Sequence, residues 1–257
     1  MANLRRFYGD FAPDMLLADL HIHTTRSDGW WEPERLAETA VARGLSAIGI
    51  TDHDDIVAGY AVANAAAKRG LPLQVLIGQE ISARAGRHDV HVLGLDLSHE
   101  IRPWQSIPAT VDAILKQGGF PILPHPRSTE RGRPTFDQIL ELEIPVAVEI
   151  YNASMIDIKR LRDRSLSDAN EEARAFYMAN RARLAGAVGG TDAHFRTIGR
   201  GLTAYRGDLR DAIARGETAV LYTPERERLM PWDPFGYVTG LRRLDRRRSE
   251  KYGQRPR

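Results

Sequence analysis

The chain has 257 residues, of which 42% are hydrophobic and 27% charged, and its formal net charge is +2. This length and composition fit one large α/β domain, alone or with a small appendage, and no internal repeat or low-complexity segment is visible. The absence of cysteine excludes disulfides and thiolate metal sites, so imidazole and carboxylate groups would have to hold any transition metal, with Zn, Mn or Fe as the candidates.

The sequence shows no membrane segment. The first residues, MANLRRFYGDFAPD, are charged and lack the apolar core of a signal peptide. No later stretch approaches the roughly 18 apolar residues that a membrane span needs. We therefore expect a soluble, cytoplasmic protein without a membrane partner.

Short apolar runs alternate with longer amphipathic stretches from Leu16 to about Val188. The runs predict strands over 16–22, 46–52, 73–81, 90–97, 120–124, 146–151 and 186–190. Between most of these strands the pattern predicts helices over 33–44, 55–70, 109–119, 135–143 and 168–186. Strand followed by helix, repeated, favours parallel strands with right-handed crossovers, and hence a barrel or a doubly wound sheet.

The first predicted strand carries two histidines, His21 and His23, in the stretch DLHIHTTRSDG. Successive side chains of a strand point to opposite faces, so these two imidazoles project from the same face and can converge on one point. This geometry suits a metal ion.

Other polar residues fall where predicted strands end. In a barrel the C-terminal ends of the strands surround one mouth, where loops build the active site. A barrel therefore accounts for the clustering better than a doubly wound sheet. The residues at or just past such ends are His21, His23, Asp52, His53, Glu80, His125, Glu149, Asp192 and His194.

Beyond His194 the pattern predicts a strand over 201–207, a helix over 208–217 and a strand over 218–223, which can close the barrel. The last ordered element is expected to end near Leu229. Residues 242–257 hold eight Lys or Arg and two Asp or Glu, so the rest of the chain carries a formal charge of −4. We expect a barrel domain over 1–229, then an extended segment and a disordered basic tail over 230–257, with an arm that contacts RNA or DNA as the alternative.

The imidazoles and carboxylates require cations if they meet at one mouth. Several carboxylates buried together are electrostatically unfavourable unless positive charge compensates them. More than one metal ion is therefore expected. The groups concerned are His21, His23, His53, His91, His125, His194, Asp28, Glu80 and Asp192.

Six motifs together resemble one protein family. In chain order they are DLHIHTTRSDG, GITDHD, GQEIS, HVLGL, PHP and GGTDAH. This order is similar to that of the PHP family, the polymerase and histidinol phosphatase domain of metal-dependent phosphoesterases. The resemblance runs from about Leu16 to about Thr223 and implies a distorted (β/α)7 barrel with a trinuclear metal site at the C-terminal ends of the strands.

The resemblance also implies a ligand for every metal position. It places one metal on His21, His23, Glu80 and Asp192. It places a second on Glu80 as a bridge with His91 and His125, and a third on Asp28, His53 and His194. His88 competes with His91, because residues three apart on a strand face opposite ways, and the match to the family motif selects His91.

Asp52 and His194 are the candidate catalytic residues. Asp52 lies beside His53 and has three open roles: a carboxylate that fixes the tautomer of a ligand histidine, a proton acceptor, or a plain strand-end hydrogen-bond acceptor. A phosphate dianion also favours a guanidinium partner. The candidate substrate-binding residues are Arg26, Arg127, Arg196 and, from the resemblance, Asn152.

The predicted function is hydrolysis of small phosphate esters, with nucleotides or short oligonucleotides among them, by a hydroxide that two or three divalent ions activate. About 25 residues separate Leu97 from Pro124. This spacing leaves no room for the helical insertion that some members of the family have between these two strands. The chain therefore resembles the shorter members, which have a PHP-associated C-terminal region. Two alternatives stay open: hydrolysis of a carboxylic ester or carbamate, and a PHP-type nuclease that uses the basic tail.

Overall fold

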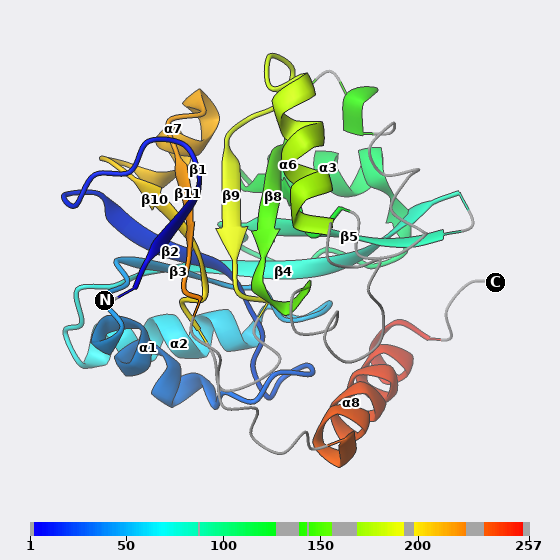
Figure 1. The fold of residues 1–257 in the computed structure, drawn as a ribbon. Helices are drawn as coiled ribbons and strands as arrows, with labels where there is room; N and C mark the ends of the chain where they lie inside the picture. Colours follow the sequence, from blue (N-terminus) through cyan, green and yellow to red (C-terminus); the bar gives the residue numbers. More distant parts are fainter. Residues whose placement is uncertain are drawn as a thin grey trace.

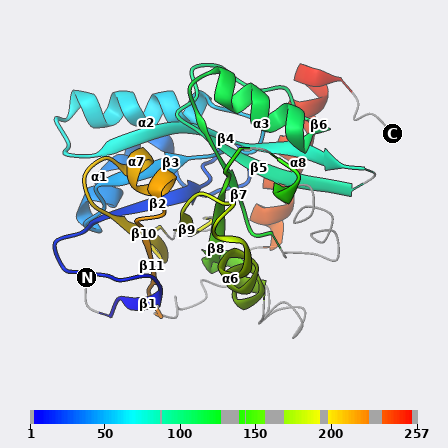
Figure 2. The same cartoon turned by 90° about the horizontal axis from the view of Figure 1, so that it is seen from above.

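The computed structural model describes residues 3–86, 88–126, 139–142, 144–155, 169–192, 198–224 and 234–253. Within these residues the strands join in one curled sheet, and helices cover its outer side (Figures 1 and 2). The order of strands in the sheet is β1-β11-β10-β2-β3-β4-β5-β7-β8-β9, with β6 paired to β4.

Most elements agree with the periodicity of the sequence. The strands are β1 (Arg5–Tyr8), β2 (Leu16–Ile22), β3 (Ala47–Ile50), β4 (Gln74–Ala85), β5 (His88–Leu95), β6 (Gln105–Ser106), β7 (Phe120–Leu123), β8 (Ala147–Asn152), β9 (Ala187–Gly190), β10 (Gly201–Tyr205) and β11 (Ala219–Tyr222). The helices are α1 (Pro33–Ala42), α2 (Val57–Lys68), α3 (Ile107–Lys116), α6 (Ala169–Asn180), α7 (Leu209–Arg215) and α8 (Pro234–Tyr252). The helix expected over 135–143 falls largely outside the described residues, and β1 was not expected.

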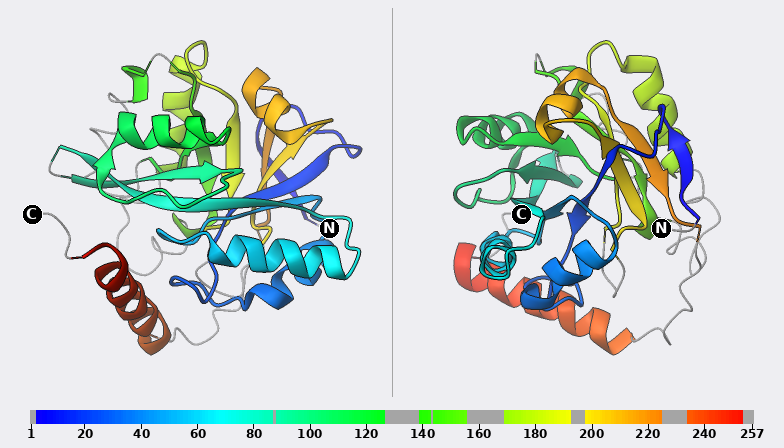
Figure 3. Two further views of the ribbon diagram at one scale, coloured as in Figure 1. Left: turned by 180° about the vertical axis from the view of Figure 1, so that it is seen from behind. Right: turned by 90° about the vertical axis from the view of Figure 1, so that its left-hand side faces the viewer.

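The strand directions correct the expectation of parallel strands throughout. Strands β2, β3 and β4 are parallel, as are β7, β8 and β9, whereas β5 runs antiparallel to both β4 and β7. Only residues 86 and 87 join β4 to β5, which is too short for a crossover helix and long enough for a hairpin. Seen from behind, these two strands extend together beyond the others (Figure 3).

The sheet curls until its last strand, β9, lies beside β10 and β2. The hydroxyl of Thr203 in β10 accepts a bond from the N–H of Gly189 at 2.9 Å and donates to its carbonyl at 3.1 Å. The N–H of Asp192 donates to the carbonyl of His21 at 2.8 Å. These contacts bring the strand ends of both halves of the sheet together (Figure 2).

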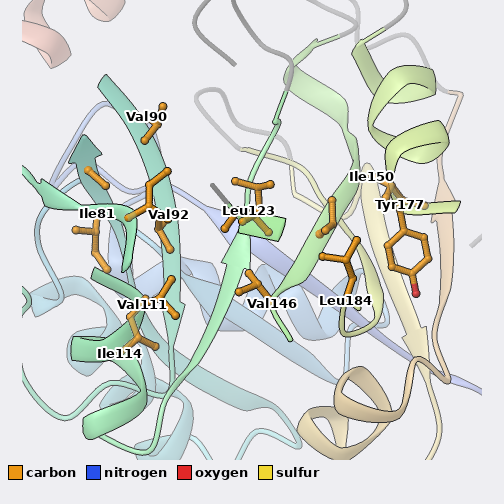
Figure 4. Packing of buried hydrophobic residues seen from close by; sticks show 14 of the residues in the cluster. Ile81, Val90, Val92, Val111, Ile114, Leu123, Val146, Ile150, Tyr177 and Leu184 are labelled. Atoms are coloured by element: carbon orange, nitrogen blue, oxygen red, sulfur yellow. The ribbon is translucent and has the colours of Figure 1, made fainter. Parts of the chain in front are cut away.

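The outer helices are held by aliphatic packing. Helix α3 begins after Ser106, whose hydroxyl accepts the N–H of Ala109, and Pro108 lies in its first turn. Figure 4 shows Val111 and Ile114 of this helix near Val92, in the same buried cluster. Burial of each such side chain contributes about 1.5–3 kcal/mol. This packing fixes the frame from which the strand-end residues project.

The C-terminal region differs from the expectation. Residues 234–252 form helix α8, where an extended segment and a disordered tail were predicted. In Figure 1 this helix lies on the side towards which β8 and β9 point. None of the helices in the described ranges has the length and apolar composition of a membrane span.

Candidate metal centre

Two adjacent imidazoles lie on the inner side of the curled sheet at the end of β2, one on His21 within the strand and one on His23 just after it. His21 and His23 are both fully buried, and their Nε2 atoms lie 3.2 Å apart. Side chains two positions apart share one face of a strand, and both rings lie against the Glu80 carboxylate on that face. The convergence expected from the sequence is therefore present.

The carboxylate of Glu80, at the middle of β4, faces these rings. Its Oε2 atom is 3.1 Å from Nε2 of His23, 3.4 Å from Nε2 of His21 and 3.2 Å from Nδ1 of His53. His53 follows β3, the strand between β2 and β4, and it forms a bridge with Glu80 in the sheet. Three neighbouring strands thus supply one buried cluster.

The second oxygen of Glu80 faces two further imidazoles. Oε1 lies 2.7 Å from Nδ1 of His91 and 3.0 Å from Nε2 of His125. His91 pairs with Ser82 in the β4–β5 hairpin, whereas His88 pairs with Ala85 near the hairpin turn. The structure thus brings His91, and not His88, to the cluster.

Two aspartates complete the described cluster. Asp192 Oδ1 is 3.2 Å from Nε2 of His23 and 3.7 Å from Nε2 of His21. Asp28 places Oδ1 3.6 Å from Nδ1 of His23 and Oδ2 3.6 Å from Nε2 of His53. Eight of the nine ligands expected from the sequence therefore meet at one place, and the ninth, His194, lies outside the described residues.

The electrostatics of the cluster are those of a cation site. Burial alone raises the pKa of Glu80, but the surrounding imidazoles outweigh it and hold this pKa well below its usual value. Burial opposes protonation of His23, yet Asp192, Asp28 and Glu80 raise its pKa to about 9. Burial lowers the pKa of His53 to about 3. Protons on some of these imidazoles thus supply positive charge that metal ions can replace.

The donor set fits divalent metal. Nδ1 of His53 is buried and has no hydrogen-bond partner within the described part of the chain, which is the state expected of a ring nitrogen held for a metal. Imidazole and carboxylate donors suit Zn, Mn or Fe. Three groups have ligand atoms that lie within 4.8 Å of one another: His21, Glu80 and His125; His21, His23 and Asp192; His23, His53 and Glu80.

Buried carboxylates hold the loops that carry both aspartates. Asp52 accepts bonds from the N–H of Thr24 at 2.9 Å and of Ser27 at 3.1 Å, and from both hydroxyls, which fixes the loop that ends in Asp28. These bonds favour the hydrogen-bond role among the three that the sequence left open for Asp52. No bond from Asp52 to an imidazole occurs among the described contacts.

Asp19 holds the backbone next to Asp192 in the same way. Its carboxylate accepts bonds from the N–H of Thr191 at 2.9 Å, from the Thr191 hydroxyl, and from the N–H of Gly199 at 2.7 Å. These contacts hold Thr191, the residue before Asp192, and the φ of 52° at Asp192 is in the left-handed region. Sequence reasoning gave Asp19 no role, although its position two residues before His21 is a usable signal.

Glu149 orients two candidate ligands from β8. Its Oε1 is 3.1 Å from Nδ1 of His21, and its Oε2 accepts the N–H of His125 at 2.8 Å and the Asn152 amide at 2.9 Å. The same amide donates to Oδ2 of Asp192 at 3.1 Å. Asn152, expected to bind substrate, thus bonds to two carboxylates of the cluster. Such partners fix the tautomer and orientation of ligand histidines.

The expected substrate arginines are only partly described. The guanidinium of Arg26 donates to Asp55 at 2.6 Å, so an ion pair holds it beside the cluster. Arg127 and Arg196, like His194, lie outside the described residues.

Residues 19–188 match the PHP domain, and the chain belongs to this family. The match covers seven of the nine expected ligands, and Asp192 and His194 lie just beyond it.

Curated relatives carry specific names. The chain is 34% identical over 136 residues to the 5'-3' exoribonuclease Rnm of Salmonella typhimurium, covering 52% of this chain and 41% of the relative. It is 42% identical over 79 residues to a 3',5'-nucleoside bisphosphate phosphatase of Chromobacterium violaceum, covering 31% of this chain and 27% of the relative. The chain thus spans less than half the length of these two relatives.

A solved structure shares the fold. It is a two-domain protein from Bacteroides vulgatus that contains a predicted PHP-like metal-dependent phosphoesterase, with a TM-score of 0.60 and 21% identity. The alignment covers 81% of this chain and 65% of that one. At this identity the likeness shows the fold alone, an α/β architecture with a curled sheet.

Proposed function

We propose that the protein is a metal-dependent phosphoesterase that hydrolyses small phosphate esters, with nucleotides and short oligonucleotides as candidate substrates. The observation that carries the proposal is the convergence of five imidazoles on the two oxygens of Glu80. Membership of the PHP domain family and the names of the relatives support it. The corresponding fold is a distorted (β/α)7 barrel over 1–229 with its metal site at the C-terminal strand ends.

The proposed ligands are His21, His23, Asp28, His53, Glu80, His91, His125, Asp192 and His194, and they hold two or three Mn, Zn or Fe ions. Glu80 is the proposed bridge, because its two oxygens face different sets of imidazoles. Glu149 faces Nδ1 of His21, so Nε2 is the nitrogen of that ring which is available to a metal.

Divalent ions bound here would lower the pKa of a water molecule and offset the negative charge of the phosphoryl oxygens. The protein's own residues hold the proposed ligands in position. Asp52 and Asp19 fix the two loops that carry Asp28 and Asp192. His21, His23 and Glu80 are buried away from bulk water, which strengthens the electrostatic contacts among them.

The experiment compares ester classes with one metal-loaded preparation. The substrates are p-nitrophenyl phosphate, bis(p-nitrophenyl) phosphate, p-nitrophenyl acetate and a 5'-phosphorylated RNA oligonucleotide. We expect turnover of phosphate esters, and loss of both bound metal and turnover in Glu80→Gln. His99→Ala is the matched control, since His99 is an exposed histidine that contacts Ser98.

Each alternative gives its own result. Faster cleavage of the acetate than of either phosphate ester would replace the proposal with a carbonyl hydrolase. Cleavage of the oligonucleotide alone would assign a nuclease. Retention of full activity by Glu80→Gln would remove the metal centre from the mechanism.

A further inference from the structure

Helix α8 places an arginine at the edge of the metal-ligand cluster. Nη2 of Arg248 donates to the hydroxyl of Ser82 at 2.7 Å, and Nε lies 2.6 Å from Oδ2 of Asp54. Asp54 in turn accepts the N–H of Ser82 at 2.8 Å and its hydroxyl at 2.9 Å. The guanidinium is therefore tied to two polar residues beside the cluster.

The strand register locates this guanidinium. Ser82 lies two residues after Glu80 in β4, so both side chains are on one face of the strand. Ser82 is directly opposite His91 in the hairpin, and Asp54 directly follows His53. Arg248 thus approaches the cluster on the side formed by these two candidate ligands.

Several contacts hold α8 in this place. The hydroxyl of Tyr252 donates to the carbonyl of Asp54 at 3.3 Å and to the carboxylate of Glu100, and its ring packs edge-on against Trp104 with centroids 6.2 Å apart. Lys251 also pairs with Glu100. The helix is fixed on the described body of the protein through its last turns.

Burial separates Arg248 from Arg246 of the same helix. Its side chain is 19% exposed, while that of Arg246, which pairs along the helix with Glu250, is 80% exposed. A buried ion pair is weak support for a stabilising role, because desolvation of both charges opposes their attraction. A guanidinium has five N–H donors, so contacts from Nε and Nη2 orient it without exhausting it.

We propose that Arg248 binds the phosphate group of the substrate beside the metal centre, so that α8 forms part of the substrate site. The inference rests on the proposed phosphoesterase function. It gives the basic C-terminal segment a role other than a disordered tail or a polymer-binding arm. The planar fork of arginine suits phosphate oxygens better than the point charge of lysine.

The test uses the full-length, metal-loaded protein and two readouts besides bound metal. Binding of inorganic phosphate is measured by calorimetry, and KM and kcat are measured with p-nitrophenyl phosphate. For Arg248→Ala we expect phosphate affinity to fall about tenfold or more, KM to rise by a similar factor, and metal content to stay unchanged. Arg246→Ala, the matched control on the same helix, should stay within about twofold of the wild type.

A second variant covers the case in which Arg248→Ala disturbs docking of α8. Arg248→Gln keeps donors for Asp54 and Ser82 but removes the charge, and we expect the same loss of phosphate affinity. Three results would overturn the proposal. A folded variant could keep the phosphate affinity of the wild type, or the wild type could fail to bind phosphate. A rise in kcat/KM in the variant would show that the helix merely occludes the site. Absence of turnover with intact, Arg248-dependent phosphate binding would instead reject only the phosphoesterase function.

Discussion

Oε1 of Glu80 lies 2.7 Å from Nδ1 of His91, although the two residues belong to different strands of the β4–β5 hairpin. The register places Glu80 opposite Leu93 and His91 opposite Ser82, so Glu80 and His91 are diagonal neighbours on one face. The hairpin thereby holds an imidazole against the carboxylate that we propose as the metal bridge.

The first prediction concerns this pair. His91→Ala should remove a ligand and lower metal affinity by more than the roughly 10–100-fold that loss of a supporting group costs. His88→Ala, in the same strand but near the hairpin turn, should leave metal content unchanged. Elemental analysis after dialysis measures both. Equal metal content in the two variants would reject His91 as a ligand.

The second prediction concerns Gly190 at the end of β9. A Cβ atom on this residue would lie 2.4 Å from Oε1 of Glu149 and 2.6 Å from Cβ of His21. Gly190→Ala should therefore displace Glu149 from His21, weaken metal binding about 10–100-fold and destabilise the fold by about 1–3 kcal/mol. Denaturant unfolding and metal titration measure the two effects.

A control variant separates a general loss of stability from this contact. Gly118 has a positive φ of 78° and nothing within 4 Å of an added Cβ. Gly118→Ala should lower stability through its backbone alone and retain metal affinity. Wild-type metal affinity in Gly190→Ala would show that the Glu149–His21 contact does not support the site.

The third prediction is that removal of metal destabilises the protein. Ions that bind only the folded state add about 2.7 kcal/mol at a free concentration 100 times their Kd. Chelation should thus lower the Tm, and added Mn or Zn should restore it. Calorimetry with verified metal loss is the measurement, and an unchanged Tm would count against a centre built from this many buried groups.

The fourth prediction is a pH dependence of metal affinity. The pKa of His23 is raised to about 9 in the metal-free protein, so its imidazole holds a proton at pH 7 that a metal must displace. Apparent affinity should rise from pH 7 to 9, and the raised pKa values of His21 and His125 add to this rise. His53 releases no proton in this pH range, because burial lowers its pKa to about 3 and its imidazole is already neutral.

Titration calorimetry in two buffers with different ionisation enthalpies counts the released protons. We expect net proton release on metal binding at pH 7 and less at pH 9. The same affinity and no release at both pH values would mean that the imidazoles are neutral before the metal binds.

The fifth prediction concerns Asp52. If it only fixes the loop through Thr24 and Ser27, Asp52→Asn should cost about 1–3 kcal/mol of stability and lower metal affinity through Asp28. The pH profile of kcat should keep its shape. If the variant has normal stability but its profile loses the acidic limb, Asp52 acts as a proton acceptor.

The sequence predicted most strands and helices, because period-2 and period-3.6 patterns are local. The two-residue spacing of His21 and His23 predicted their shared face, and the resemblance to the PHP family supplied the other candidate ligands. It did not predict the antiparallel hairpin, because strand direction depends on the length of the connection and not on the apolar pattern of each strand.

The contacts of the supporting carboxylates could not be predicted from the local sequence pattern. Asp19 and Glu149 act on residues far along the chain, namely Thr191 and His21, and only the curl of the sheet brings these groups together. The position of Asp19 near His21 and of Glu149 at a strand end marks both residues as candidates, but it does not reveal their distant partners.

The sequence by itself determined the chemistry of the site: imidazoles and carboxylates without thiolates, placed at strand ends where a curled sheet gathers them. Only the tertiary structure decided where the basic segment lies. A run of arginines has the same local pattern in a free tail and in a docked helix, and the difference lies in partners such as Asp54 and Glu100, which become neighbours of α8 only after the chain has folded. Long-range packing therefore placed Arg248 beside the cluster, whereas local periodicity had already placed His21 and His23 on one face.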